Sequence, residues 1–260
     1  MVKQHTLTLT PIHFPIVRPG EKLSKIVVDS LRDQGLRPLR GDVLCVASKI
    51  VSTCENRIVK LTEIHPTKTA RRFAKQWRID PRLATLVTRE ADEILGGVKG
   101  FLLTTKNGIL TPNAGIDLKN SPSNTATLWP IDPDRSARRL RRSLERVYET
   151  KMGVEIVDSH VTALRLGTVG LAIATSGFAP IRDDRGVHDL FWRSIRVTRS
   201  NIADDMAAAA HMIMGESTER IGAVIIRHGP FGIAREGNGE LVKLSRRRCL
   251  IGNSLTNAMK

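Results

Sequence analysis

Short runs of β-branched and apolar residues alternate along the chain with segments in which apolar residues recur every three or four positions. The short runs are bounded by Gly, Asp or Ser, which is typical of strands. Strands are therefore predicted at residues 6–9, 43–47, 101–105, 154–157, 171–175, 195–198 and 223–226.

The longer segments predict amphipathic helices, because residues three and four positions apart share one helix face. They lie within residues 23–31, 140–148 and 202–213. Two helix starts are explicit. Asp132 precedes Pro133, an N-cap followed by a first-turn proline, and Asn201 precedes Asp204 by three residues, a capping arrangement.

The predicted strands and helices do not alternate strictly along the chain. No Gly-x-Gly-x-x-Gly or Gly-x-x-x-x-Gly-Lys-Ser/Thr motif is present, so a Rossmann domain or a P-loop NTPase is not expected. We predict a single domain over residues 1–260. The alternative is two lobes joined at about residues 131–150.

Apolar runs and cysteines favour a cytoplasmic protein. No run approaches the roughly 20 apolar residues that a membrane-spanning helix needs, and the first residues contain no export signal. Cys45, Cys54 and Cys249 are widely separated, which favours neither a zinc site nor a disulfide framework.

The charge of the chain indicates anionic partners without choosing among them. The formal net charge is +15, and much of it lies in two basic runs, at residues 135–146 and 243–248. Only 4% of the residues are aromatic, and no ring is interleaved with the basic runs as a single-strand stacking platform requires. This pattern favours an enzyme with anionic substrates over a dedicated nucleic-acid binder.

Four segments carry polar residues that packing does not require: residues 111–120, 154–160, 182–189 and 214–222. Asp117 lies in a predicted turn and Asp158 at a predicted strand end, and together they would offer hard oxygen ligands to Mg²⁺ or Mn²⁺. The bland alternatives are a simple turn, a helix cap for Asp158, ordinary helix termination before Glu216, and a solvated loop at 182–189.

Read together, these segments resemble the coenzyme F420-0:L-glutamate ligase family over most of the chain. The motifs that carry the resemblance are Phe14-Pro15-Ile16-Val17, Gly41-Asp42-Val43 running to Ser48-Lys49-Ile50-Val51-Ser52, Asn113-Ala114-Gly115-Ile116-Asp117 with Asn120, Pro130-Ile131-Asp132-Pro133-Asp134, Asp158-Ser159, and Ala203-Asp204-Asp205 followed by Met214-Gly215-Glu216.

The resemblance implies an α+β fold with mixed sheets and flanking helices, assembled as an intertwined homodimer. It also implies a reaction in which GTP, with Mg²⁺ or Mn²⁺ and a K⁺ ion, drives the joining of L-glutamate to coenzyme F420-0. The expected course is attack of the terminal carboxylate on the γ-phosphate, followed by displacement of phosphate from the acyl phosphate by the amine of glutamate.

Site residues follow from the same resemblance by position. The implied metal ligands are Asp117, Asp158, Ser159 and Glu216, of which the three carboxylates are the predicted catalytic residues. The implied nucleotide-binding residues are Phe14, Pro15, Ile16, Val17, Ser48, Lys49, Asn120, Met214 and Gly215, within a loop that extends to Ile221.

The chain departs from the family pattern at basic positions. Thr53 replaces a nucleotide-contacting lysine, and Val161 and Thr162 replace a Gly-Arg pair. The missing phosphate contact is then expected from Lys49 or Arg165. Two alternatives remain open: a carboxylate–amine ligase with another substrate, and a non-catalytic nucleic-acid-binding relative.

The histidines carry no catalytic assignment in this interpretation. His211 lies among alanines on a predicted helix and is interpreted as structural.

Overall fold

The computed structural model describes residues 6–229, 232–238 and 242–258. The chain forms two compact units, one from Met1–Glu63 and Ile116–Leu241, the other from Ile64–Gly115 and Val242–Lys260. Both combine sheets with helices, which confirms the predicted α+β class. Residues 131–150, considered above as a junction between lobes, lie inside the first unit.

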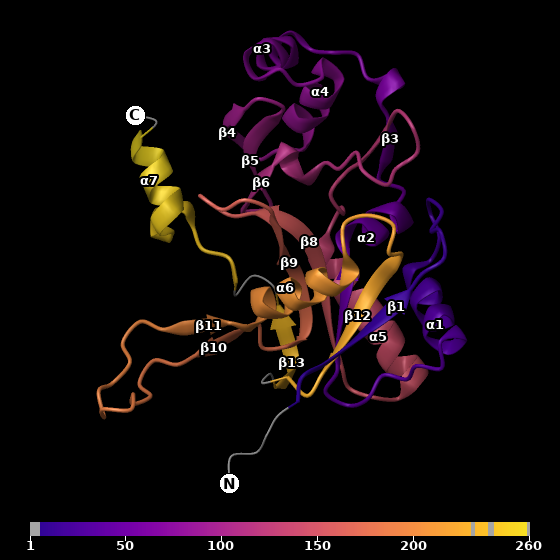
Figure 1. Cartoon of the computed structure of the whole chain (residues 1–260), viewed down its shortest axis with the longest axis vertical. Helices are drawn as coiled ribbons and strands as arrows, with labels where there is room; N and C mark the ends of the chain where they lie inside the picture. Colours follow the sequence, from indigo (N-terminus) through magenta and orange to yellow (C-terminus); the bar gives the residue numbers. More distant parts are fainter. Residues whose placement is uncertain (1–5, 230–231, 239–241, 259–260) are drawn as a thin grey trace. The chain divides into compact units, whose positions relative to one another are not determined.

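The first unit is built on a mixed six-stranded sheet (Figure 1). Its strands, in spatial order, are β1 (Thr8–His13), β12 (Ile221–Arg227), β2 (Val43–Ala47), β8 (Gly153–Val161), β9 (Thr168–Phe178) and β13 (Ile233–Asn238). Only β2 and β8 pair in parallel; the other neighbours are antiparallel. β2 is as predicted, and β8, β9 and β12 extend the predicted runs, whereas β1 begins two residues later than predicted.

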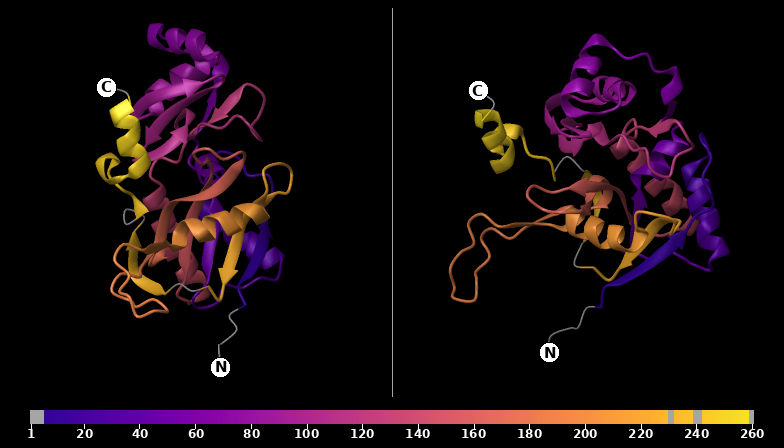
Figure 2. Two further views of the ribbon diagram at one scale, coloured as in Figure 1. Left: turned by 60° about the vertical axis from the view of Figure 1, so that its left-hand side comes forward. Right: turned by 45° about the horizontal axis from the view of Figure 1, so that its top comes forward.

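Helices cover both faces of this sheet. They are α1 (Leu23–Asp33), α2 (Ser48–Cys54), α5 (Pro133–Tyr148) and α6 (Ile202–Met214). α6 packs on one face, while α1 and α5 pack on the other (Figure 2). Both predicted N-caps are confirmed: the Asp132 carboxylate accepts from the Arg135 amide at 2.8 Å, and the Asn201 side chain accepts from the Asp204 amide at 3.2 Å.

The sheet buries its apolar residues against these helices. Val43, Leu44, Ile156, Phe178 and Ile226 are fully buried. Burial on both faces is what a near-continuous apolar strand such as β2 needs. The core therefore fixes the central pair of strands whose ends carry the candidate site.

Two smaller ladders complete the first unit. One joins β3 (Ile58–Lys60) to β7 (Thr125–Thr127). A 3₁₀ turn, η1 (Leu61–Glu63), follows β3 in the chain. The other, β10 (Ile181–Asp183) with β11 (Arg199–Asn201), forms the base of an arm that leaves the sheet (Figures 1 and 2).

The strand predicted at residues 195–198 is wrong. This segment runs along the arm, and the regular pairing begins only at Arg199. Val197 is 82% exposed, so burial against a core does not stabilise this segment as a strand. β-propensity without a packed face is not enough to make a strand.

The second unit contains a three-stranded antiparallel sheet with helices. Its elements are α3 (Lys68–Trp77), α4 (Pro81–Glu90), β4 (Glu93–Val98), β5 (Phe101–Lys106), β6 (Ile109–Pro112), the 3₁₀ turns η2 (Asn113–Gly115) and η4 (Arg246–Arg248), and α7 (Leu250–Ala258). Asn113 accepts from the buried Leu102 amide at 2.9 Å, so the start of the Asn-Ala-Gly-Ile-Asp string has a structural role in this unit.

None of the helices that the structure describes combines the length and the apolar composition needed to cross a bilayer.

Candidate active site

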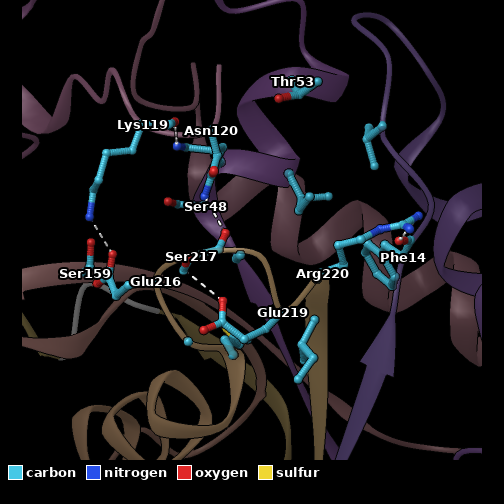
Figure 3. A pocket seen from close by; sticks show the side chains of 18 of the residues that line it. Phe14, Ser48, Thr53, Lys119, Asn120, Ser159, Glu216, Ser217, Glu219 and Arg220 are labelled. Carbon is cyan, nitrogen blue, oxygen red and sulfur yellow. Dashed lines mark hydrogen bonds and ion pairs between the residues drawn. The ribbon is translucent and has the colours of Figure 1, made fainter. Parts of the chain in front are cut away.

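A cavity of about 530 Å³ opens in the first unit, where the parallel pairing of β2 with β8 ends (Figure 3). Its walls come from five parts of the chain that are distant in sequence: residues 14–17, 47–53, 117–120, 157–159 and 211–222. Apolar groups line it together with lysine, serine and carboxylate side chains, which suits a ligand with both a ring and charged groups.

The parallel pairing of β2 and β8 explains the floor of this cavity. Ala47, the last residue of β2, pairs with Val157, so Ser48 lies beside Asp158 at the point where this parallel pairing ends, while β8 continues beside β9 to Val161. The Ser48 hydroxyl donates to Asp158 Oδ1 at 2.6 Å. Ligands often bind beyond the carboxyl ends of neighbouring parallel strands.

The Asp158 carboxylate is held in an unfavourable environment for its charge. Burial raises its pKa to about 6, and the nearby Asp117 carboxylate adds to this, while the hydrogen bond from Ser48 opposes it. A group in this condition gains most when a cation arrives, because a cation removes both unfavourable effects.

Asp117 lies at the wall of the cavity, and hydrogen bonds fix its backbone. Its amide and carbonyl exchange hydrogen bonds with Thr127 at 2.9 and 2.8 Å. Its side chain forms an ion pair with Lys49, Nζ to Oδ2 2.6 Å, and accepts from the Lys119 amide at 2.8 Å. Lys49 also donates to the Lys119 carbonyl oxygen.

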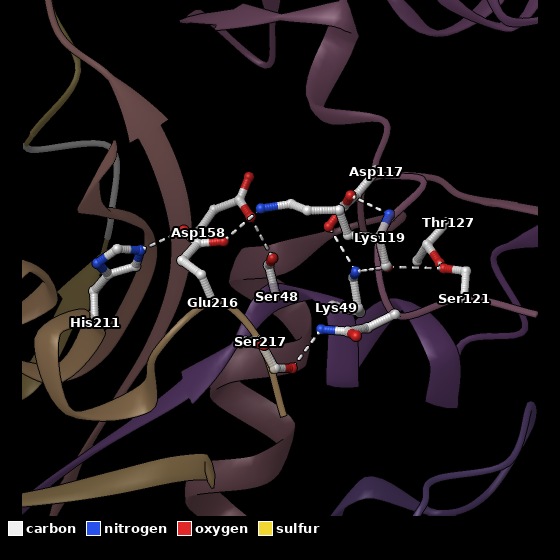
Figure 4. Close-up of polar contacts among 11 residues, drawn as sticks. Ser48, Lys49, Asp117, Lys119, Ser121, Thr127, Asp158, His211, Glu216 and Ser217 are labelled. Atoms are coloured by element: carbon white, nitrogen blue, oxygen red, sulfur yellow. Dashed lines mark hydrogen bonds and ion pairs between the residues drawn. The ribbon is translucent and has the colours of Figure 1, made fainter. Parts of the chain in front are cut away.

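Glu216 follows α6 and lies at the centre of a second polar cluster (Figure 4). Lys119 Nζ contacts Oε2 at 2.7 Å, while Thr168 Oγ1 at 3.0 Å and His211 Nε2 at 2.8 Å both contact Oε1. Burial alone would raise the Glu216 pKa, but hydrogen bonds from Lys119, His211 and Thr168 outweigh it and hold the pKa at about 2.

The remaining wall depends on close packing around Phe14. A Cβ on Gly222 would lie 2.1 Å from the Phe14 ring, so glycine is required for the ring to lie against β12. Phe14 is buried, whereas Ile16 is 83% exposed at the cavity. Asn120 Nδ2 donates to the Ser217 carbonyl at 2.8 Å and closes the loop after α6 over the cavity.

Nearly all residues implied by the resemblance line this cavity. They are Phe14, Pro15, Ile16, Val17, Ser48, Lys49, Asp117, Asn120, Asp158, Ser159, Met214, Gly215 and Glu216. Arg165 does not: it is exposed on the turn between β8 and β9. Thr53 lines the cavity, whereas Val161 and Thr162 are exposed.

Sequence reasoning missed three contributors to this site. Lys119 forms the ion pair with Glu216, Thr168 contacts the same carboxylate, and His211, interpreted as structural, points into the site. A signal existed for Lys119, which stands two residues after Asp117. Nothing local distinguishes Thr168 or His211, because their role depends on the packing of α6 against β9.

The arrangement of the acidic side chains decides whether the cavity could hold a metal ion. No three His, Cys, Asp or Glu side chains within the described ranges converge closely enough to hold a metal ion. Instead, Lys49 neutralises Asp117 and Lys119 neutralises Glu216. The hard oxygen donors that Mg²⁺ and Mn²⁺ prefer therefore surround one cavity, with lysine ammonium groups beside two of them.

Comparison with known proteins gives a consistent result. The family model described as F420-0:Gamma-glutamyl ligase matches residues 11–228. Curated relatives named coenzyme F420:L-glutamate ligase include those of Methanothermobacter thermautotrophicus, 36% identical over 86% of this chain and 90% of the relative, and Methanopyrus kandleri, 36% over 85% and 87%. The Archaeoglobus fulgidus relative is 34% identical over 91% of this chain and 94% of its own length.

The match covers both the strands that build the cavity and the loops that line it. The chain therefore belongs to the F420-0:gamma-glutamyl ligase family and is a ligase.

Proposed function

We propose that this chain adds L-glutamate to coenzyme F420-0 in a GTP-dependent reaction that uses Mg²⁺ or Mn²⁺ and passes through an acyl phosphate. The observation that carries the proposal is the gathering of Asp117, Asp158 and Glu216 around one cavity together with Lys49 and Lys119. Family membership supplies the reaction class, and the relatives' names supply the acceptor and the amino acid.

The oxygens of Asp117, Asp158, Ser159 and Glu216 are the proposed metal ligands. A divalent cation bound there would neutralise charge on the transferring phosphoryl group. Asp158 fits this role because its buried charge lies near that of Asp117 and both gain from a cation. Asp117 and Glu216 fit it because each already forms an ion pair with a lysine ammonium group.

Lys49 and Lys119 have a second part in the proposal. Once a cation neutralises the carboxylates, both ammonium groups become free to contact phosphate oxygens. Lys119 thereby compensates for the basic residues absent at Thr53, Val161 and Thr162. The exposed face of Ile16, beside Phe14 to Val17, offers an apolar surface to the guanine base.

The proposed reaction joins two anions at one cavity in two displacements. The acceptor carboxylate attacks the γ-phosphorus of GTP and GDP leaves; the glutamate amine then attacks the carbonyl carbon and phosphate leaves. Such transfers depend mainly on positioning and charge neutralisation. In this proposal the lysines of the cavity neutralise charge on the phosphate oxygens, and the carboxylates hold the cation that positions them.

The test is mass spectrometry of coenzyme F420-0 after incubation with the purified protein, L-glutamate, GTP and Mg²⁺ or Mn²⁺. We expect gain of one or more glutamyl residues together with GDP, and no product from Asp117→Asn. GTP-dependent glutamylation of a different carboxylate would overturn the acceptor. The absence of product with any nucleotide would overturn the proposed function.

A further inference from the structure

The contacts of Glu216 are divided unequally between its two oxygens. Oε1 accepts from His211 Nε2 at 2.8 Å (Figure 4) and from Thr168 Oγ1 at 3.0 Å. His211 lies on helix α6 and Thr168 on strand β9. Among the described residues, Oε2 contacts only the side chain of Lys119, which lies on a loop and is 62% exposed. One oxygen is therefore held by the framework, and the other by a group that can move away.

We propose that His211 is a positioning residue: with Thr168 it fixes Glu216 through Oε1 so that Oε2 faces the cavity and is available to the divalent cation. This inference rests on the proposed function, because it concerns the same metal. Lys119 then serves as the counter-ion of Oε2 when the cation is absent.

The packing of α6 against β9 sets the place of His211. A Cβ on Gly170 would lie 2.1 Å from the Ala207 carbonyl oxygen and 2.6 Å from His211 Cβ. Only a glycine there allows the helix to approach so closely, since real Cβ atoms do not make contacts of this length. Gly170 also pairs with Ser159, so the same strand position serves both the helix contact and a proposed ligand.

Thr168 reaches Glu216 from the same strand. It pairs with Val161 at the end of the β8–β9 ladder, two residues before Gly170. Residues two apart on a strand point to the same face, so Thr168 emerges on the face that Gly170 opens to α6. Helix and strand therefore present a donor each to one carboxylate oxygen.

A purely structural role does not account for the His211 side chain. The end of α6 is capped by the backbone: the Gly215 amide donates to the His211 carbonyl at 3.1 Å, a bond any residue would make. The imidazole is directed instead to Glu216, across the turn that follows the helix.

The experiment compares His211→Gln with His211→Asn. The Gln amide nitrogen reaches about as far as Nε2, the contacting atom, whereas the Asn amide reaches only to the place of Nδ1. Mn²⁺ binding to the nucleotide-free protein is measured by calorimetry, and kcat and the KM values for GTP and coenzyme F420-0 are measured at saturating and limiting Mn²⁺.

We expect His211→Asn to weaken Mn²⁺ binding about 10- to 100-fold, the usual effect of losing a group that orients a ligand. His211→Gln should restore most of the affinity, and the KM for coenzyme F420-0 should stay unchanged in both. Thr168→Val should weaken Mn²⁺ binding in the same direction, and Thr168→Ser should not.

Three outcomes would overturn the inference. Unchanged Mn²⁺ affinity in His211→Asn would show that Glu216 does not need the imidazole. Equal losses in both His211 variants, accompanied by a lower Tm, would show a structural role. A wild-type protein that neither binds Mn²⁺ nor forms product would mean that the proposed function itself has failed.

Discussion

Strand β8 carries two carboxylates three residues apart, Glu155 and the half-buried Asp158, and their surroundings differ. Asp158 receives a hydrogen bond from Ser48, lies near Lys49 and opens onto the cavity. Glu155 is fully buried, and neither of its oxygens has a hydrogen-bond partner among the described residues. One carboxylate thus faces the cavity just beyond the point where the pairing of β8 with β2 ends, whereas the other lies within that pairing and away from the cavity.

The difference follows from what each environment does to the charged form. Burial raises the pKa of both groups, to about 6 for Asp158 and well above the ordinary value for Glu155, where the field of Asp204 adds to the effect. Ser48 and Lys49 partly compensate Asp158. Glu155 lies opposite Thr175, whose buried hydroxyl likewise finds no hydrogen-bond partner in the part of the chain that the structure describes. We infer that its surroundings favour the protonated form of Glu155 and that this side chain binds no metal ion.

Asp158→Asn is expected to have the largest effect of any change to these two regions. Losing an anionic ligand should lower kcat/KM by about three orders of magnitude, or ~4 kcal/mol of transition-state stabilisation. Tm should be unchanged or higher, because the buried charge is removed. Steady-state kinetics with thermal denaturation checks both; a variant with more than a tenth of wild-type activity would remove Asp158 from the metal site.

Glu155→Gln should leave the ligase activity unchanged and should change how the free energy of unfolding depends on pH. In the unfolded chain Glu155 ionises near 4.5, and in the folded protein its pKa is higher. Below pH 4.5 both states hold the proton. Above it the unfolded state releases the proton first, so the free energy of unfolding falls by up to about 1.4 kcal/mol per pH unit until the folded pKa is reached.

The Gln variant lacks this loss. Urea denaturation should therefore show it to be more stable than wild type at pH 8 and similar at pH 4. A wild-type protein whose stability relative to the variant rises between pH 4 and pH 8 would contradict the raised pKa of Glu155.

Ser48→Ala sharpens the account of Asp158 with a smaller effect. The hydrogen bond from Ser48 lowers the Asp158 pKa, so its loss should raise that pKa above about 6. Protons then compete better with the cation. We expect Mn²⁺ affinity to fall about tenfold at pH 6 and less at pH 8, in line with one hydrogen bond to a charged group. An equal loss at both pH values would assign Ser48 a different role.

Thr175→Val should have the smallest effect. Its buried hydroxyl has no partner among the described residues, and valine has the same shape without the polar group. We expect a gain of about 1 kcal/mol in the free energy of unfolding, with unchanged ligation. A clear loss of stability in denaturant titration would mean that the hydroxyl is satisfied, for instance by Glu155.

Local sequence predicted the central elements because their signals are local. The apolar run of β2 and the caps at Asp132 and Asn201 each act within a few residues, and all three are confirmed. Most of the second unit was missed. Its α3 is rich in Arg and Lys and buries only Ala70, and β4 and β6 belong to a small sheet with few buried positions.

The site divides in the same way. Asp117, Asp158 and Glu216 were found because they stand in recognisable strings, and the fold brings them to one cavity. Their partners were not found, because the contacts of Glu216 with Lys119 and Thr168 span 97 and 48 residues of chain. Such pairs depend on the packing of α6 and β9, which no local pattern encodes.

The most direct test of the account is Mn²⁺ binding, followed by electron paramagnetic resonance of the free ion, in wild type, Asp158→Asn and Glu155→Gln. The two variants make the same chemical change on one strand, one at the cavity and one in the core. We predict that Glu155→Gln binds Mn²⁺ as wild type does and that Asp158→Asn loses the site. Equal binding by both variants, or loss in Glu155→Gln alone, would contradict the assignment of the cavity as the metal and nucleotide site.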